Sequence, residues 1–291
     1  MRRRKLLAGL ALTPIAAVHA APTPAGAVEA LAGDLTRRDL AEGGASIAGA
    51  GREAVRWALS LGGGDRRLDH AVAVLADRVA SALGDAGLAD PREQHRLLDA
   101  AERVAVAPEL RAHIRLDRAS VLDACGDHAG AARHAEDALT GRLPAVQAAN
   151  LRAGASRYRE RAGDTDAAVA HVEAAERLWA AADPGDVPAW AVPVLGDAGH
   201  VPGVIGRAWL VLGRYRRAEE WLGEAAGAFG AGRVRGRAAC LARRAHARLA
   251  LGNLGGCDED LGEAGVLAAG LGSAGVAEAL GRVRRLRGVR R

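Results

Sequence analysis

The sequence predicts an all-α fold in which pairs of helices repeat along the chain and stack into a solenoid. The first observation is a recurring glycine that follows an apolar helix end and precedes a second helical pattern. It stands at Gly126, Gly163, Gly213 and Gly252, at intervals of 37, 50 and 39 residues. Glycine adopts the positive φ that ends a helix without steric cost, so each of these positions is suited to a turn between two helices.

The second observation is that small or apolar residues stand at fixed distances after each of these glycines. A small residue follows after five positions, an apolar one after nine, and alanine after twelve in every unit. The three columns are Ala131, Ala168, Ala218 and Cys257; Ala135, Val172, Leu222 and Leu261; and Ala138, Ala175, Ala225 and Ala264. Helices joined by a tight turn approach closely only where small side chains face each other, so the columns predict the contact face of each pair.

Less regular helices are expected before these units. Residues 28–40 carry a short helical pattern that ends at a glycine pair, and 52–61 carry another that three glycines stop. Asp65 is suited to cap a longer helix, and Pro91 is well placed at the first position of a helix that reaches about residue 106. We therefore expect a basic and apolar segment at 1–30, irregular helices at 31–107, and the repeats at 108–291.

Two segments of the repeat region differ from the helix pairs. Four prolines, at positions 184, 188, 193 and 202, fall in the long interval between the second and third units, and prolines at this density end helices. We therefore expect a connecting insertion at 183–203. The run 275–291 places apolar residues at helical spacing with arginines between them, which predicts a solvated basic helix that closes the array. Contact of this helix with acidic partners or nucleic acid is the alternative.

The unit around Gly213 resembles the tetratricopeptide repeat (TPR). Its small, aromatic and apolar residues follow that pattern at Gly206, Trp209, Leu212, Gly213, Tyr215, Ala218, Leu222 and Ala225. The other units keep the turn and the second helix but lack the aromatic residues, and all the intervals exceed the usual 34 residues. The expected fold is therefore a TPR-like helical-repeat solenoid.

A wider resemblance covers about residues 50–285. It is carried by Pro188-Ala189-Trp190, Asp197-Ala198, Gly206-Arg207-Ala208, Leu212-Gly213-Arg214 and Ala218-Glu219. These segments are similar to the C-terminal TPR region of actinobacterial XRE-type transcriptional regulators, whose helix-turn-helix would already have ended where this chain begins. The resemblance implies a sensor or partner-binding region, and the near-absence of lysine agrees with a GC-rich, actinobacterial genome.

Three aromatic residues are the candidate contacts for a partner or ligand. Trp190 lies in the proline-rich insertion, whereas Trp209 and Tyr215 lie in the third unit. Large aromatic side chains anchor peptides in grooves, and they also fill helix cores. Trp190 is the strongest candidate because it lies outside the repeat pattern.

No catalytic or metal-binding motif stands out. Cys125, His128 and His134 have a spacing that suggests a metal site, but they straddle the turn glycine and lack a fourth ligand. The glycines at 62–64 lack the lysine and hydroxyl residue of a phosphate loop, and no nucleophile stands at an informative distance from a base. We therefore expect a binding protein without catalytic activity, metal or cofactor, whose partner is a protein, a peptide or a small signalling ligand.

The charge pattern argues against nucleic-acid binding by the folded body. The net charge is +5, yet four basic residues at the start and six arginines at the end outweigh it, which leaves the rest of the chain at −5. DNA binding by this chain alone is not expected. A regulator whose helix-turn-helix was lost or lies upstream of the assigned start is the alternative to a scaffold in a regulatory pathway.

The N-terminus leaves two locations open. Arg3-Arg4-Lys5 and the apolar run 8–18 resemble a twin-arginine export signal within 2–20, with a small-residue cleavage site at Val18-His19-Ala20. The run is too short to span a bilayer. The cysteines are odd in number and far apart, which indicates a reducing compartment. We expect a cytoplasmic protein, with an exported binding protein as the alternative.

Overall fold

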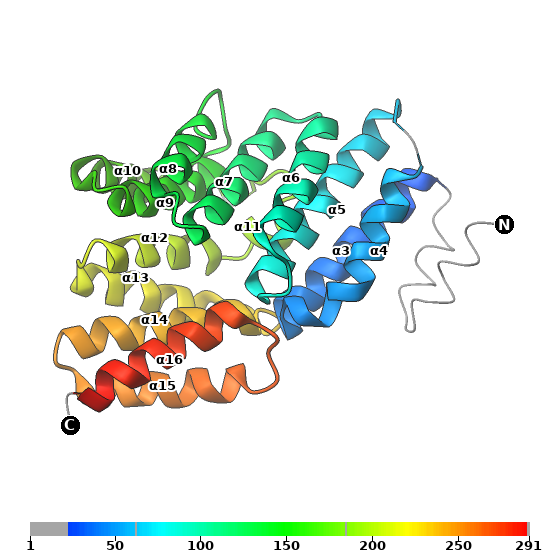
Figure 1. Ribbon diagram of the computed structural model, residues 1–291. Coiled ribbons are helices and arrows are strands. Elements are labelled where there is room, and N and C mark those ends of the chain that lie inside the picture. The colour runs from blue at the N-terminus through cyan, green and yellow to red at the C-terminus, as the bar shows by residue number, and fades with distance from the viewer. Residues whose placement is uncertain (1–22, 62, 184, 290–291) are drawn as a thin grey trace.

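The computed structural model describes residues 23–61, 63–183 and 185–289, and every regular element in these ranges is a helix (Figure 1). The predicted all-α class is therefore confirmed. Residues 1–22, which contain the signal-like segment, lie outside the described residues, so the export signal stays a prediction. None of the described helices is long and apolar enough to cross a membrane.

Five helix pairs form the body of the molecule, and successive pairs stack side by side from the cyan to the orange part of the chain (Figure 1). A final helix, α16 (Ala274–Val289), packs on α14 and α15. The pairs are α5 (Arg66–Asp85) with α6 (Pro91–Val104), α7 (Pro108–Ala124) with α8 (His128–Asp137), α9 (Ala145–Arg161) with α10 (Thr165–Ala180), α12 (His200–Val211) with α13 (Tyr215–Ala228), and α14 (Val234–Ala250) with α15 (Leu254–Ala268).

The turn glycines have the left-handed conformation that closes a helix. Their φ angles are 85° at Gly126, 87° at Gly163, 68° at Gly213 and 81° at Gly252. The residue after each glycine donates its N–H to the carbonyl five residues back, as Arg214 does to Trp209 at 2.9 Å. This bond satisfies a carbonyl that the helix end would otherwise leave without a partner. The chain can therefore turn back within three residues.

One pair of the same kind, α5 with α6, lies in the region where the sequence suggested irregular helices. Gly87 has φ 68°, and Leu88 donates its N–H to Leu83 O at 3.0 Å. α6 begins only at Pro91, and the Asp90 side chain caps it. The connection is longer than in the later pairs, so this pair does not share their residue spacing.

The predicted columns form the buried contact face of each pair. In the fourth pair, Ala218, Leu222 and Ala225 are completely buried. A Cβ on Gly206 would stand 2.7 Å from Leu222 Cγ, so the absence of a side chain there lets α12 and α13 approach. Leu261 is half-buried. The other matching residues of the remaining pairs are buried: Ala131, Ala135, Ala138, Ala168, Val172, Ala175, Cys257 and Ala264.

The N-terminal helices extend the array beyond its first pair. They are α3 (Pro24–Glu42), the short 3-10 helix η1 (Gly44–Ile47) and α4 (Ala48–Leu59), and they pack on α5. Gly44 lies directly against α5, because a Cβ there would overlap the Ala82 carbonyl. Val28 and Leu35 of α3 share one core with Leu75 and Val79 of α5.

The proline-rich insertion joins the third and fourth pairs. It contains a one-turn helix, α11 (Val192–Leu195), and α12 begins at His200, inside the range 183–203. Pro202 occupies the first turn of α12, where a helix does not use the N–H that proline lacks.

The array curves until its C-terminal end meets its N-terminal end, so that α3 lies beside α14 (Figure 1). Gly272 donates its N–H to Glu42 O at 3.0 Å and accepts from the N–H of Ala45 at 3.3 Å. Arg235 of α14 forms ion pairs with Asp39 of α3 at 2.7 Å and with Asp85 of α5 at 3.1 Å. These contacts join the two ends of the curve around the interior.

Candidate functional site

The first helices of the five pairs line a cavity inside the curve. It has two adjoining parts of about 510 Å³ and 320 Å³, which share wall residues from α5, α7, α12 and α14. Ligand sites in proteins usually enclose roughly 300–1,000 Å³. The inner cavity is therefore large enough for a small ligand or a short chain segment.

The wall of the inner cavity follows a register set by the turn glycines. Residues six, nine and thirteen positions before the glycine of each pair share one helix face, because residues three and four apart are neighbours on a helix. The sixth are Ser81, Ser120, Arg157, Arg207 and His246; the ninth are Arg78, Asp117, Gly154, Val204 and Arg243; and the thirteenth, from α7 onward, are His113, Asn150, His200 and Ala239.

Several arginines of the wall are paired with carboxylates, Arg233 and Arg235 among them. Arg233 lies 3.1 Å from Asp197, and Arg235 holds Asp39 and Asp85 at the closure of the array. Burial raises the pKa of Asp39 above its ordinary value, and the charge of Arg235 opposes this shift. These pairs tie helices together.

Three arginines from successive helix pairs form no ion pair with a carboxylate within 4.0 Å among the described residues: Arg157 of α9, Arg207 of α12 and Arg243 of α14. Arg78 of α5 forms no such pair either, and it lies beside His113. Arg157 is only 8% exposed, and its Nε makes no hydrogen bond. Burial, and then the charges of Arg157 and Arg243, lower the pKa of Arg207. Burial and the charge of Arg157 also lower the pKa of Arg243. This arginine triad is a concentrated positive charge that an anion would relieve.

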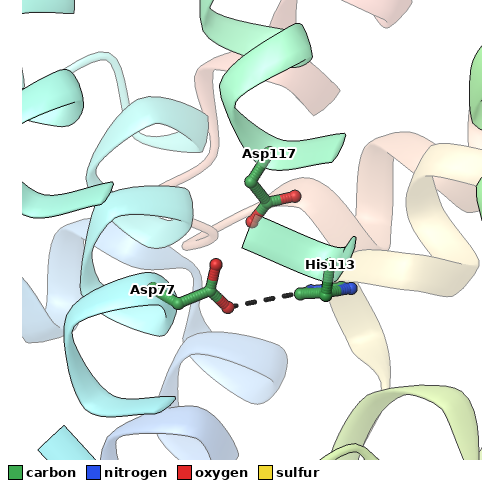
Figure 2. A group of neighbouring side chains, drawn as sticks. All are labelled: Asp77, His113 and Asp117. Carbon is green, nitrogen blue, oxygen red and sulfur yellow. Dashed lines mark ion pairs between the residues drawn. The ribbon is translucent and has the colours of Figure 1, made fainter. Parts of the chain in front are cut away.

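Another part of the wall carries His113 and Asp117 of α7, and Asp77 of α5 lies directly behind them (Figure 2). Asp77 is completely buried, and neither of its carboxylate oxygens accepts a hydrogen bond. Its Oδ2 lies 3.7 Å from His113 Nε2. Burial, and then the charge of Asp117, raise the pKa of Asp77, and burial raises the pKa of Asp117 to about 6. Both carboxyl groups therefore ionise less readily than a carboxyl group in water.

Trp190 lies behind this part of the wall and does not line the cavity. Its ring meets the His113 ring edge-on at 5.3 Å between centroids, and the Arg78 guanidinium lies 5.7 Å from its centroid. It packs against the N-terminal and C-terminal cores alike. The insertion thus packs a tryptophan against Arg78 of α5 and His113 of α7.

Trp209 and Tyr215 lie away from the cavity. Trp209 is 2% exposed, and its Nε1 donates to Glu176 Oε1 at 2.7 Å, as the Nε1 of Trp221 does. Tyr215 packs near His246 with 6.1 Å between ring centroids. Glu176 therefore fastens α10 to α12 and α13 through two indoles, and Trp209 serves the core.

Cys125, His128 and His134 do not gather into one group. Cys125 is exposed, whereas His128 Nδ1 lies 2.9 Å from Asp123 Oδ1. In the described part of the chain, the group of three His, Cys, Asp or Glu side chains close enough to share an ion is Asp77, His113 and Asp117.

Sequence reasoning missed the arginine triad and the Asp77 group. In sequence these residues look like ordinary polar residues of amphipathic helices. Counting back from each turn glycine would have placed most of them on one inner face, because the offsets of six and nine hold in all five pairs.

Comparison with known proteins supports the fold alone. No family model and no curated protein match the chain. Among solved structures, BtubC (BKLC) from P. vanneervenii is similar over 78% of this chain and 91% of that one, with a TM-score of 0.50 at 15% identity. Two structures of the TPR-like repeats of a Podosopora anserina kinesin light chain each cover 67% of this chain and 93% of their own, with TM-scores of 0.42 and 0.41 at 16% and 17% identity. The chain has a TPR-like fold of stacked helix pairs.

Proposed function

We propose that this chain is a non-catalytic scaffold that binds a protein partner by holding an acidic segment of it in the inner cavity. The observation that carries the proposal is the arginine triad, Arg157, Arg207 and Arg243, whose members form no ion pair with a carboxylate among the described residues. Guanidinium groups bind carboxylates through paired, charge-assisted hydrogen bonds. An acidic partner supplies the charge that the fold leaves out.

The spacing of the triad fits an extended chain. Its members come from α9, α12 and α14, the first helices of three successive pairs. Packed helices lie roughly 8–10 Å apart, and an extended chain advances about 3.3 Å per residue, so acidic residues about three positions apart would reach successive arginines. Repeat folds use such curved inner surfaces for protein binding.

Uncharged polar side chains stand beside the arginines in the same register. Ser81, Ser120 and Asn150 all line the cavity. Their hydroxyl and amide groups can donate to the main chain of a bound segment and accept from it. The wall thus offers contacts to both the side chains and the backbone of a peptide.

A peptide titration tests this proposal. A fluorescein-labelled peptide of eight residues with glutamate at every third position is titrated with the full chain and followed by fluorescence anisotropy. We expect saturable binding that weakens at least tenfold in Arg207→Gln. The matched control is Arg216→Gln, an exposed arginine of α13, which should leave the affinity unchanged. Equal binding of a lysine peptide, or equal loss in the two variants, would refute the proposal.

The setting of this scaffold is also part of the proposal. The resemblance to XRE-type regulators supports a regulatory pathway, and the odd, separated cysteines support the cytoplasm. An in-frame helix-turn-helix upstream of Met1 would instead support the transcriptional regulator. A mature chain that lacks residues 1–20 on N-terminal sequencing would support the exported binding protein.

A further inference from the structure

A group of side chains at the cavity wall and directly behind it is not used by the proposed peptide binding. Asp77 belongs to α5, while His113 and Asp117 lie four residues apart on α7 and so project from one helix face (Figure 2). One ligand atom from each of the three lies within 4.8 Å of the other two. The group thus joins two neighbouring helix pairs at one point.

Three polar atoms of this group lack partners. Both oxygens of Asp77 and Nδ1 of His113 are buried without a hydrogen bond, and Asp77 is 0% exposed. The 3.7 Å between Asp77 Oδ2 and His113 Nε2 is too long for a hydrogen bond. Leaving a buried carboxylate without partners costs several kcal/mol, which a bound cation would offset.

Neighbouring positive charge compensates the group only in part. Arg78 places Nη1 3.4 Å from His113 Nε2, and its Nη2 makes no hydrogen bond. Burial, and then the charge of Arg78, lower the pKa of His113. A neutral imidazole has one nitrogen lone pair, and a metal ion bound at Nε2 would replace the contact with Arg78. One cation thus faces two carboxylates and one neutral imidazole.

We propose that Asp77, His113 and Asp117 bind a divalent transition-metal ion, with Zn²⁺ as the best match. One imidazole nitrogen with two carboxylate oxygens suits zinc and its neighbours, whereas Ca²⁺ and Mg²⁺ are held by oxygen ligands. In a tetrahedral zinc site the ligand atoms stand roughly 3.4 Å apart, so side-chain movements of about 1 Å close the site.

The site opens on the inner cavity. His113 and Asp117 line it, whereas Asp77 lies at the back and does not. An ion can therefore enter from the cavity. The inference does not depend on the arginine triad, because the two sets share no residue.

Titration of the chelator-stripped full chain tests the site. Isothermal calorimetry with Zn²⁺ should give one ion per chain, and Co²⁺ should give a visible spectrum of nitrogen and oxygen ligands without a thiolate charge-transfer band. Asp77→Asn, His113→Gln and Asp117→Asn should each weaken Zn²⁺ binding at least tenfold. Asp117 is only half-buried, so its variant keeps the test valid if Asp77→Asn fails to fold.

Matched controls are available at the α7–α8 turn. There His128 pairs with Asp123 beside the exposed Cys125. His128→Gln and Cys125→Ser should keep full Zn²⁺ affinity, and so should Arg207→Gln, which separates this site from peptide binding. The inference is overturned by absence of stoichiometric binding, by unchanged affinity in the three site variants, or by loss of binding in Cys125→Ser.

Discussion

The interior of the helix pairs and the wall of the inner cavity are built in opposite ways. Between α12 and α13, small and apolar residues such as Ala218 and Leu222 are completely buried. On the wall and directly behind it, Arg157 and Asp77 are buried with hydrogen-bonding atoms that have no partner. Unpaired buried charge costs stability. The contrast indicates that the pairs hold the fold, and it supports the proposal that the wall binds a partner.

The largest effect is expected from a break inside a pair. Leu222→Ala removes a fully buried side chain next to Gly206 and leaves a cavity where the two helices touch. We expect a loss of about 2–5 kcal/mol in the free energy of unfolding. Urea unfolding followed by circular dichroism measures it. Leu251→Ala, at a 42% exposed site, is the control and should cost less than about 0.5 kcal/mol.

The next effect should come from the closure of the array. Arg235→Gln leaves the carboxylates of Asp39 and Asp85 facing each other without their shared cation. We expect a loss of about 2–3 kcal/mol, at the low side for a buried pair because Arg235 keeps some exposure. An unchanged urea midpoint would show that the two ends of the curve do not depend on this contact.

The cost of Arg235→Gln should also depend on pH. Burial already raises the pKa of Asp39 in the folded chain, and loss of Arg235 raises it further. When the pKa of a carboxyl group is higher in the folded chain than in the unfolded chain, the free energy of unfolding falls as the pH rises from the unfolded pKa through the folded pKa. The gap between wild type and variant should therefore widen from pH 4 upward. A gap that narrows over this range would contradict the account.

Smaller effects should separate the turn glycines from ordinary ones. Gly213→Ala forces a side chain into φ 68° and should cost about 1–2 kcal/mol. Gly262→Ala, in the exposed middle of α15, meets nothing within 4 Å and should stabilise by about 0.5–1 kcal/mol. Thermal unfolding of both variants measures the difference, and shifts of the same sign would argue against a special role for the turn.

The smallest effect on stability is expected at the wall. Arg207→Gln removes one of three mutually repelling guanidinium groups, so the free energy of unfolding should stay constant or rise by up to about 0.5 kcal/mol. A clear loss of stability would mean that Arg207 serves the fold. This variant should therefore lose binding without losing stability.

Local patterns in the sequence predicted the local parts of the structure. The glycine at each turn and the small or apolar residues five, nine and twelve positions later depend only on one helix pair, so their spacing is visible in the chain. The α5–α6 pair does not show this spacing, because the connection between its two helices is longer. The closure between Glu42 and Gly272 joins residues from opposite ends of the chain, and no periodic pattern encodes such a contact.

The candidate site was harder to foresee for the same reason. Arg157, Arg207 and Arg243 come from three different pairs, and each alone looks like a polar residue on an amphipathic helix. Their shared charge becomes visible only when curvature brings the first helices together. The sequence pattern makes Trp190 the strongest candidate contact for a partner, whereas in the structure it lies behind the wall, against His113.

Hydrogen exchange with mass spectrometry tests the central claim most directly, because it reports on the inner and outer helices in one experiment. The full chain is compared with and without the glutamate peptide. We expect the bound peptide to slow amide exchange in the inner helices α9, α12 and α14 and to leave exchange unchanged in the outer helices α10, α13 and α15. Protection confined to the outer helices or to the arginine-rich C-terminal end would contradict the claim that the inner wall is the binding surface.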